Sequence, residues 1–213
     1  MPALADEPAA RPVDGSRTGF FGRIWDVRTD TLWFGGEPVE RDYVDHTGAV
    51  GIVALNDDDS VMLVQQYRHP VRQRLWEIPA GLLDLPGESP LVAAQRELAE
   101  EADLVAEEWH VLLDLLPSPG GSNESIRLYL ARGLSPAVDE FDRVDEEAEF
   151  QHRWVPLDDA VAAVLAGRVQ NAATVAGLLA THAARAAGWS TLRPADAPWP
   201  TRSAGPRATG DLD

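Results

Sequence analysis

The chain contains no cysteine, and this absence excludes disulfide bonds and thiol chemistry. It has no uninterrupted apolar run of roughly 18 residues, so no membrane span is expected. Its Pro-, Asp- and Glu-rich start lacks the basic and apolar regions of a signal peptide. Basic residues are scarce, because 18 Lys and Arg face 35 Asp and Glu and the net charge is −17. This balance argues against general binding to nucleic acid or an anionic membrane. We expect a cytoplasmic protein.

The organisation of the chain follows from its length and its ends. At 213 residues it is long enough for one domain with a sizeable core. Residues 1–17 are rich in Ala, Pro and charge and are predicted to form a disordered arm, and residues 193–213 a C-terminal tail that is loose or draped on the surface. Between them we expect an N-terminal β-hairpin extension over residues 18–47 and a main domain over residues 48–192.

Strand and helix patterns are interspersed along the chain, which favours an α+β protein with a mixed sheet. Turn residues at 34–38 and at 56–59 each predict a hairpin between the two strands that flank them. The expected strands are 20–34, 39–45, 49–55, 61–67, 76–78, 109–115, 125–131 and 151–155. One helix is expected to start at Pro90. Two more are expected over residues 157–166 and 171–187, and Gly188 is expected to end the last of them.

The helix that starts at Pro90 carries the most informative pattern. Ser89 is a good N-cap and Pro90 suits the first helical position. Apolar residues recur at helical spacing and predict a core-facing stripe of Leu91, Ala94, Leu98 and Ala102. At about 100° per residue, Glu97 and Glu101 lie at the border between this stripe and solvent. A wall of a cleft is therefore expected there.

Three carboxylates, Glu97, Glu100 and Glu101, lie on this helix, and a fourth, Glu88, lies in the loop before it. Glu97 and Glu101 are four residues apart, a pairing of like charges that is mildly destabilising without a cation. Oxygen-only ligands at this density suit Mg²⁺ or Mn²⁺ better than zinc. The alternative is a solvated acidic face, which is common on ordinary helices.

The frame around these carboxylates resembles the signature of the Nudix hydrolases. Gly81, Glu88 and the run Arg96-Glu97-Leu98-Ala99-Glu100-Glu101 stand in the order of the Nudix box, with the expected seven residues between Glu88 and Arg96. Two departures are present, since six residues replace five between Gly81 and Glu88, and Asp103 stands where a glycine is expected. The extra residue falls in a loop, where insertion is tolerated, and Asp tolerates the left-handed conformation of a helix end. Neither departure removes a carboxylate.

The resemblance implies a fold and a metal site. The fold is a mixed β-sheet sandwiched between helices, with the N-terminal hairpin as an extension. The implied ligands of Mg²⁺, or of Mn²⁺, are the carboxylates of Glu97, Glu100 and Glu101 and the backbone carbonyl of Ala80. Arg96 would orient these carboxylates through an ion pair with Glu88, and Gly81, like Glu88, would lie directly behind the metal ligands.

Segments outside the box are similar to the ADP-ribose pyrophosphatase branch of the family. They are Gln65–Arg68, Leu75–Gly81 and Pro119, which lies 15 residues after Leu104. The resemblance implies that Arg68 clamps a phosphate, whereas a surface ion pair is the alternative. Glu77 would either accept a hydrogen bond from the substrate or pair with an arginine.

The same branch implies a catalytic base in a loop before the strand 151–155. The alignment assigns this role to Glu147, with Glu146 as the alternate, and a carboxylate near a metal-bound water can take its proton. On composition alone this acidic run is a solvated loop. Glu124, in a polar loop, is a further candidate contact to ribose or phosphate.

In the N-terminal hairpin, the aromatic residues are either core or ligand contacts. In resembling enzymes this hairpin packs on a second subunit and supplies an aromatic ring that stacks on adenine. Trp25 is the first choice for this role and Phe21 the second, and Arg41 could reach a phosphate. A homodimer is therefore expected.

Together these features predict a Mg²⁺-dependent hydrolase of a nucleoside diphosphate derivative, with ADP-ribose as substrate and AMP and ribose 5-phosphate as products. The alternatives are a Nudix hydrolase of a sugar nucleotide, a dinucleotide coenzyme or an oxidised nucleotide, or a non-catalytic nucleotide-binding module.

Overall fold

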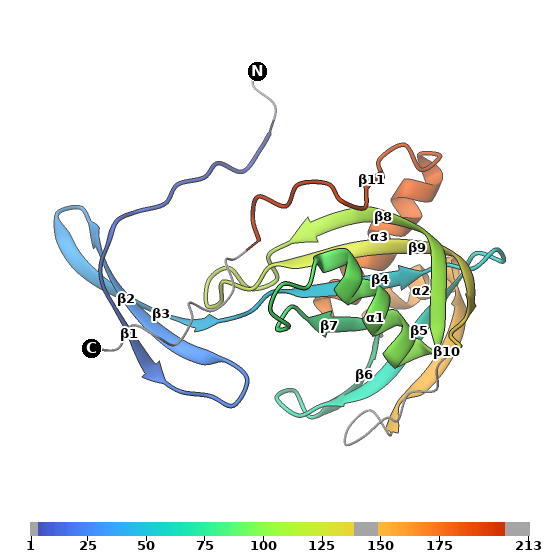
Figure 1. The fold of residues 1–213 in the computed structure, drawn as a ribbon, viewed down its shortest axis with the longest axis horizontal. Coiled ribbons are helices and arrows are strands. Elements are labelled where there is room, and N and C mark those ends of the chain that lie inside the picture. Colours follow the sequence, from blue (N-terminus) through green and yellow to red (C-terminus); the bar gives the residue numbers. More distant parts are fainter. Residues whose placement is uncertain (1–3, 139–148, 203–213) are drawn as a thin grey trace. The chain divides into compact units, whose positions relative to one another are not determined.

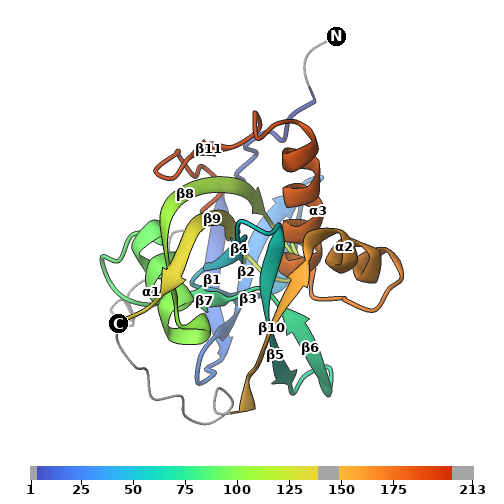
Figure 2. The ribbon, with the colours of Figure 1, turned by 90° about the vertical axis from the view of Figure 1, so that its right-hand side faces the viewer.

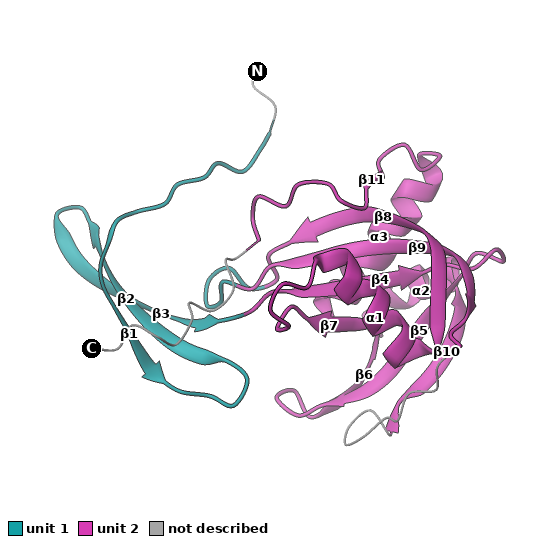
Figure 3. Ribbon diagram, in the orientation of Figure 1, with its two compact units in different colours: residues 1–46, 118–123 teal, residues 47–117, 124–213 magenta. Residues whose placement is uncertain are grey.

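The structure is a computed structural model that describes residues 4–138 and 149–202. It divides into two compact units, which are coloured separately in Figure 3. Unit 1 comprises Met1–His46 and Ser118–Asn123, and unit 2 comprises Thr47–Pro117 and Glu124–Asp213. Each unit is described by itself.

Unit 1 contains a three-stranded antiparallel sheet in the order β1-β2-β3 (Figure 1). Its strands are β1 (Val13–Phe20), β2 (Asp26–Phe34) and β3 (Glu37–Asp45). The hairpin between β2 and β3 is confirmed, and it turns through Gly35 and Gly36, which have φ of 62° and 90°. Glycine is the residue that adopts two successive positive φ values without strain. The disordered arm predicted for residues 1–17 is wrong in its last part, because β1 begins at Val13 and pairs with β2.

Unit 2 is built on a five-stranded mixed sheet in the order β11-β8-β9-β4-β7. Its strands are β4 (Ala49–Ala54), β7 (Ala80–Leu82), β8 (Leu104–Leu115), β9 (Ile126–Pro136) and β11 (Arg193–Pro194). β4 and β9 run parallel, and the other neighbours are antiparallel. Every residue of β4 is buried, as expected for a strand that is covered on both faces.

A second sheet of unit 2 has the order β10-β5-β6. Its strands are β5 (Ser60–Arg68), β6 (Gln73–Glu77) and β10 (Gln151–Pro156). The hairpin predicted between β4 and β5 is therefore wrong, because one isolated bridge, between Leu55 and Val61, connects these segments instead of a ladder. A strand has two edges, and β9 and β7 take both edges of β4, so that β5 pairs with β6 and β10 instead.

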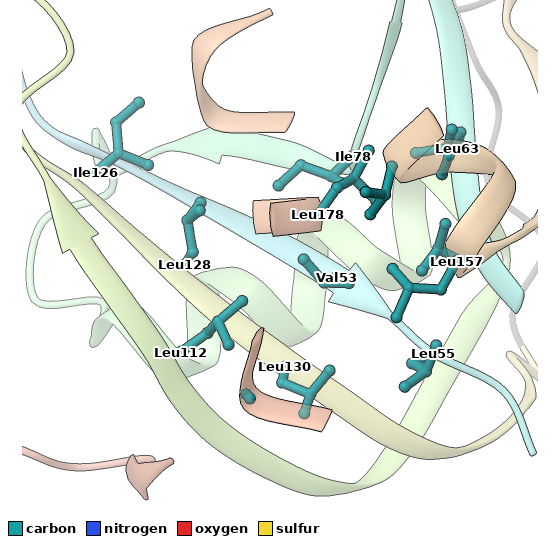
Figure 4. Packing of buried hydrophobic residues seen from close by; sticks show 14 of the residues in the cluster. Val53, Leu55, Leu63, Ile78, Leu112, Ile126, Leu128, Leu130, Leu157 and Leu178 are labelled. Atoms are coloured by element: carbon teal, nitrogen blue, oxygen red, sulfur yellow. The ribbon is translucent and has the colours of Figure 1, made fainter. Parts of the chain in front are cut away.

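The described residues contain three helices: α1 (Pro90–Ala102), α2 (Leu157–Leu165) and α3 (Ala172–Ala186). α1 and α3 pack against the five-stranded sheet, and α2 packs against α3, β5 and β10. α1 lies on one face, and α2 and α3 lie on the other (Figures 1 and 2). Alternate residues of β4 point to opposite faces, because side chains of a strand alternate. Ile52 belongs to the apolar cluster that contains Leu98 of α1. Val53 belongs to the cluster that contains Leu178 of α3 (Figure 4). The predicted sandwich of a mixed sheet between helices is confirmed.

The residues after α3 return to the sheet. β11 pairs with the middle of β8, and Ala195, Ala197 and Trp199 pack against the apolar cluster on the α1 side. None of the helices in the described ranges is both long and apolar enough to cross a membrane.

Candidate active site

Helix α1 is bounded by the residues that the sequence indicates. The Ser89 hydroxyl accepts a hydrogen bond from the backbone N–H of Val92 (3.3 Å), and Pro90 opens the helix. At the other end Asp103 has φ 55° and ψ 34°, and its N–H bonds to the carbonyl of Ala99 (3.1 Å). Asp103 thus adopts the left-handed conformation that usually favours glycine. These caps fix the length of the helix, and with it the spacing of its carboxylates.

One guanidinium, that of Arg96, faces three carboxylates. Its Nε and Nη2 bond to the two oxygens of Glu88 at 3.0 and 3.1 Å. Its Nη1 bonds to Glu97 Oε1 (2.8 Å) and to Glu100 Oε2 (2.9 Å). We refer to Glu88, Arg96, Glu97 and Glu100 as the Arg96 cluster. The ion pair expected between Arg96 and Glu88 is present, and negative charge is in excess around it.

The pKa values in the Arg96 cluster follow from this arrangement. Hydrogen bonds from Arg96 lower the pKa of the Glu88 carboxyl, against the opposite effect of burial. In turn, hydrogen bonding to Glu88 raises the pKa of Arg96, with further contributions from Glu97 and Glu100. Both shifts favour the charged forms of Glu88 and Arg96.

Glu101 differs from the other carboxylates because it is buried, with 7% of its surface exposed. Its Oε2 accepts a hydrogen bond from the backbone N–H of Ala80 (2.9 Å), the first residue of β7. A buried carboxylate needs such partners, since burial without them is costly. The bond places the last turn of α1 beside the start of β7, whose Ala80 carbonyl is the predicted fourth ligand.

Gly81 leaves the space that Glu97 fills. A Cβ atom at position 81 would lie 1.9 Å from Glu97 Cδ and 2.0 Å from its Oε1. Heavy atoms that are not bonded do not approach this closely, so any larger residue at position 81 would displace the Glu97 side chain. The presence of glycine at this position of the box thus has a steric explanation.

The donors of the Arg96 cluster and Glu101 fit a hard divalent cation by their chemistry, because all are oxygens and their negative charge exceeds that of one arginine. Over residues 4–138 and 149–202, no three acidic or histidine side chains are arranged to hold a metal ion as they stand. Two of the carboxylates, Glu97 and Glu100, are instead bonded to Arg96.

Arg68 and Glu77 form a second pair. Arg68 Nε and Nη2 donate to Glu77 Oε1 and Oε2 at 3.0 and 2.8 Å, a two-bond contact between adjacent strands β5 and β6. Glu77 is 2% exposed, whereas 45% of the Arg68 side chain is exposed. Of the two roles considered for Glu77, the pairing with an arginine is observed. The pair leaves Arg68 anchored at one end and open to solvent at the other.

The remaining predicted residues lie elsewhere. Glu124 is half-buried, and burial raises the pKa of its carboxyl. Within unit 1, the Trp25 ring stacks on His46 with centroids 4.9 Å apart, and Arg41 Nη1 donates to the carbonyl of Glu40 (2.8 Å). Phe21 is exposed. The predicted base Glu147 and its alternate Glu146 lie outside the described residues, and their role stays a prediction.

Sequence reasoning missed two residues of unit 2 that bond to distant parts of the chain. His152 of β10 bonds through Nε2 to the backbone carbonyl of Glu101. Arg127 of β9 is 3% exposed and bonds to Asp114. Arg127 carried a signal, because a charged residue alone in a run of apolar residues must be paired if it is buried. His152 carried none, because its partner is a backbone atom 51 residues away.

Comparison with known proteins agrees with this geometry. The family model described as NUDIX domain matches residues 45–176. The chain belongs to the Nudix family, and it is a hydrolase of that family.

Individual relatives extend the match over most of the chain. The ADP-ribose pyrophosphatase of Mycobacterium tuberculosis is 45% identical over 197 residues, which cover 91% of this chain and 94% of the relative. The methanol dehydrogenase activator of Bacillus methanolicus is 34% identical and covers 73% of this chain and 84% of its own length. A solved structure described as an ADP compounds hydrolase has the same fold, with a TM-score of 0.70 and 22% identity over 86% of this chain and 99% of its own.

Proposed function

We propose that this protein is a Mg²⁺-dependent hydrolase that splits ADP-ribose into AMP and ribose 5-phosphate. The observation that carries the proposal is the cluster of three carboxylates around one arginine, with Glu101 and Ala80 beside it. The 45% identical relative is named for the same substrate. The conversion consumes one water, which attacks a phosphorus as the bond between that phosphorus and the bridging oxygen breaks.

The residues that would hold Mg²⁺, or Mn²⁺ in its place, are Glu97, Glu100, Glu101 and the carbonyl oxygen of Ala80. When bound, such a cation supplies charge neutralisation of the diphosphate and a lowered pKa of bound water. Arg96 keeps the carboxylates of the cluster oriented, and its own charge is balanced by Glu88.

The other residues bind and orient the substrate. Arg68 is anchored by Glu77, so its guanidinium is preorganised to receive a phosphate oxygen. Glu147, with Glu146 as the alternate, accepts the proton of the attacking water. Glu124 contacts the ribose or a phosphate. Each of these roles is a proposal that single substitutions can test.

Unit 1 provides the adenine contact and the homodimer contact in this proposal. Trp25 is backed on one face by His46, which suits a ring that stacks on a base with its other face, and Arg41 contacts a phosphate. The unit also exposes large apolar side chains, which mark interaction surfaces when they gather. They are Phe20, Phe21, Ile24, Trp33 and Phe34. We place the enzyme in the cytoplasm.

The direct test incubates the purified protein with ADP-ribose and Mg²⁺ and separates the products, with EDTA in a matched reaction. AMP and ribose 5-phosphate that form only with the metal support the proposal. A panel of a sugar nucleotide, a dinucleotide coenzyme and an oxidised nucleotide decides between substrates, since the proposed metal site would recognise the diphosphate and not the group attached to it. Retained ADP-ribose binding without metal-dependent hydrolysis of any of these compounds would identify a non-catalytic binding module instead.

A further inference from the structure

A hydrogen bond joins β10 to the last turn of α1. Nε2 of His152 lies 2.5 Å from the backbone carbonyl oxygen of Glu101. A carbonyl oxygen can only accept, so Nε2 carries the hydrogen and donates it. The bond joins the sheet β10-β5-β6 to the helix that bears the acidic residues.

The carbonyl of Glu101 lies in the last turn of α1 (Pro90–Ala102). The last four carbonyls of an α-helix lack the amides that would follow them, and the N–H of the C-cap Asp103 is bonded to Ala99 and Leu98 instead. The last turn of α1 contains no basic residue. A donor from another element is therefore needed, and His152 supplies it.

Glu101 is consequently held at two points. Its carboxylate accepts from the N–H of Ala80 in β7 (2.9 Å), and its backbone accepts from His152 in β10. The two anchors belong to different sheets of unit 2. Each bond fixes a different part of Glu101, since one holds the carboxylate and the other holds the backbone of the helix turn that carries it.

We propose that His152 is a positioning residue for the metal site, which sets the place of the Glu101 carboxylate through the backbone of the last turn of α1. The proposal rests on the metal-binding role assigned to Glu101 under the proposed function. It concerns the hydrogen-bond donor of His152 and not its charge. It predicts that an N–H of similar reach can replace the imidazole.

Three variants separate this role from others. His152→Phe keeps a ring and removes the donor, His152→Gln keeps an N–H donor, and Arg153→Gln changes the exposed neighbour that points to the opposite face of β10. Manganese binding without substrate is measured by the loss of the free Mn²⁺ electron paramagnetic resonance signal. Turnover, KM for the nucleotide and melting temperature are measured on the same preparations.

In His152→Phe we expect Mn²⁺ affinity and kcat to fall by roughly 10- to 100-fold, the usual effect of losing a partner that orients a metal ligand. KM for the nucleotide stays unchanged, since the substrate contacts are intact. His152→Gln recovers most of the loss, and Arg153→Gln matches the wild type.

The proposal is overturned if His152→Phe binds Mn²⁺ like the wild type, or if His152→Gln is as impaired as His152→Phe. A fall in melting temperature with unchanged Mn²⁺ affinity would show a purely structural contact. The metal measurement also separates the two proposals. A wild-type protein that binds Mn²⁺ and fails to cleave ADP-ribose refutes the proposed function alone, whereas one that binds no Mn²⁺ refutes the role of His152 as well.

Discussion

Two arginines of unit 2, Arg96 and Arg127, each bind one carboxylate through two hydrogen bonds, yet their surroundings are opposite in charge. Around Arg127, two guanidiniums share one carboxylate, because Arg193 also bonds to Asp114 (3.0 Å). The rest of the Arg127 environment is neutral and closed. Its Nη1 and Nη2 donate to the carbonyls of Ala197 and Pro198 at 2.7 and 3.0 Å, and its guanidinium lies 4.8 Å from the centre of the Trp199 ring.

Around Arg96, three carboxylates share one guanidinium. The Arg96 side chain is 27% exposed. Loss of a buried arginine that is bonded to a carboxylate and to backbone carbonyls destabilises a fold, because its partners lose their donors. Arg96 lies on helix α1 and is outnumbered by carboxylates, so the cluster carries a net negative charge that suits a cation. The balance of charge, rather than the presence of an ion pair, distinguishes the two kinds of cluster, and four substitutions test this distinction.

The largest effect is expected from Glu101→Gln. The substitution removes the charge of the buried carboxylate and keeps its shape, so we expect kcat to fall on the order of 10³-fold, about 4 kcal/mol of activation free energy. Thermal stability changes little in comparison. Steady-state kinetics with Mg²⁺ and a melting curve check both, with Glu108→Gln on the exposed side of β8 as the control. Wild-type turnover in Glu101→Gln would contradict its role as a metal ligand.

Arg127→Met is expected to act on stability instead. It breaks a buried pair and removes the donors of two carbonyls, which costs about 3 kcal/mol of unfolding free energy. Activity per folded molecule is unchanged. Urea unfolding measures the difference, and Arg168→Met, at an exposed arginine, provides the reference. If Arg127→Met lost turnover while remaining as stable as wild type, the two clusters would not differ in kind.

Gly81→Ala tests the space behind Glu97. The added Cβ collides with the Glu97 carboxyl group, and a flexible side chain can move aside at low cost to stability. We expect activity to fall roughly 10-fold, as for loss of a group that orients a ligand, with a small change in melting temperature. Gly15→Ala, where the nearest atom lies 4.0 Å away, should change neither. A large loss of stability in Gly81→Ala would show that the Glu97 side chain cannot move away from the added Cβ atom.

The smallest effect concerns Glu88 and pH. Because Arg96 lowers the pKa of Glu88 below its ordinary value of 4.5, the ionised form is favoured in the folded state. Its contribution to stability is fully present above pH 4.5 and is lost as the pH falls through the lowered pKa. The melting temperature of Glu88→Gln should therefore lie below that of wild type at pH 7, and the two should converge as the pH falls below the lowered pKa of Glu88. A difference that persists unchanged at low pH would contradict the ion pair.

Local features of the fold were predictable because they depend on neighbours in sequence. The bounds of α1 follow from Ser89, Pro90 and Asp103, each of which acts on its own helix end. The pairing of Arg96 with Glu88 follows from the motif. The hairpin through Gly35 and Gly36 follows from turn chemistry.

Features that depend on distant partners were not predictable in the same way. The turn after Leu55 resembles a hairpin turn, yet β4 takes β9, a strand from far along the chain, as its parallel neighbour. Nothing in the local pattern reports such a partner. The arrangement of Arg127 with Ala197 and Pro198 likewise joins residues 70 and 71 positions apart. The Pro- and Ala-rich composition there predicted a tail that is loose or draped on the surface, and it did not indicate these bonds.

The fixed C-terminal segment has a practical consequence for anyone who produces this protein. Trp199 lies against Arg127, and the segment before it covers the apolar side of β8 and β9. A purification tag or fluorescent partner is therefore best joined after Arg202. A protein that ends before Ala195 would expose apolar surface of β8 and β9, and the Arg127 guanidinium would lose its contacts with residues 197–199. We expect it to accumulate as insoluble material.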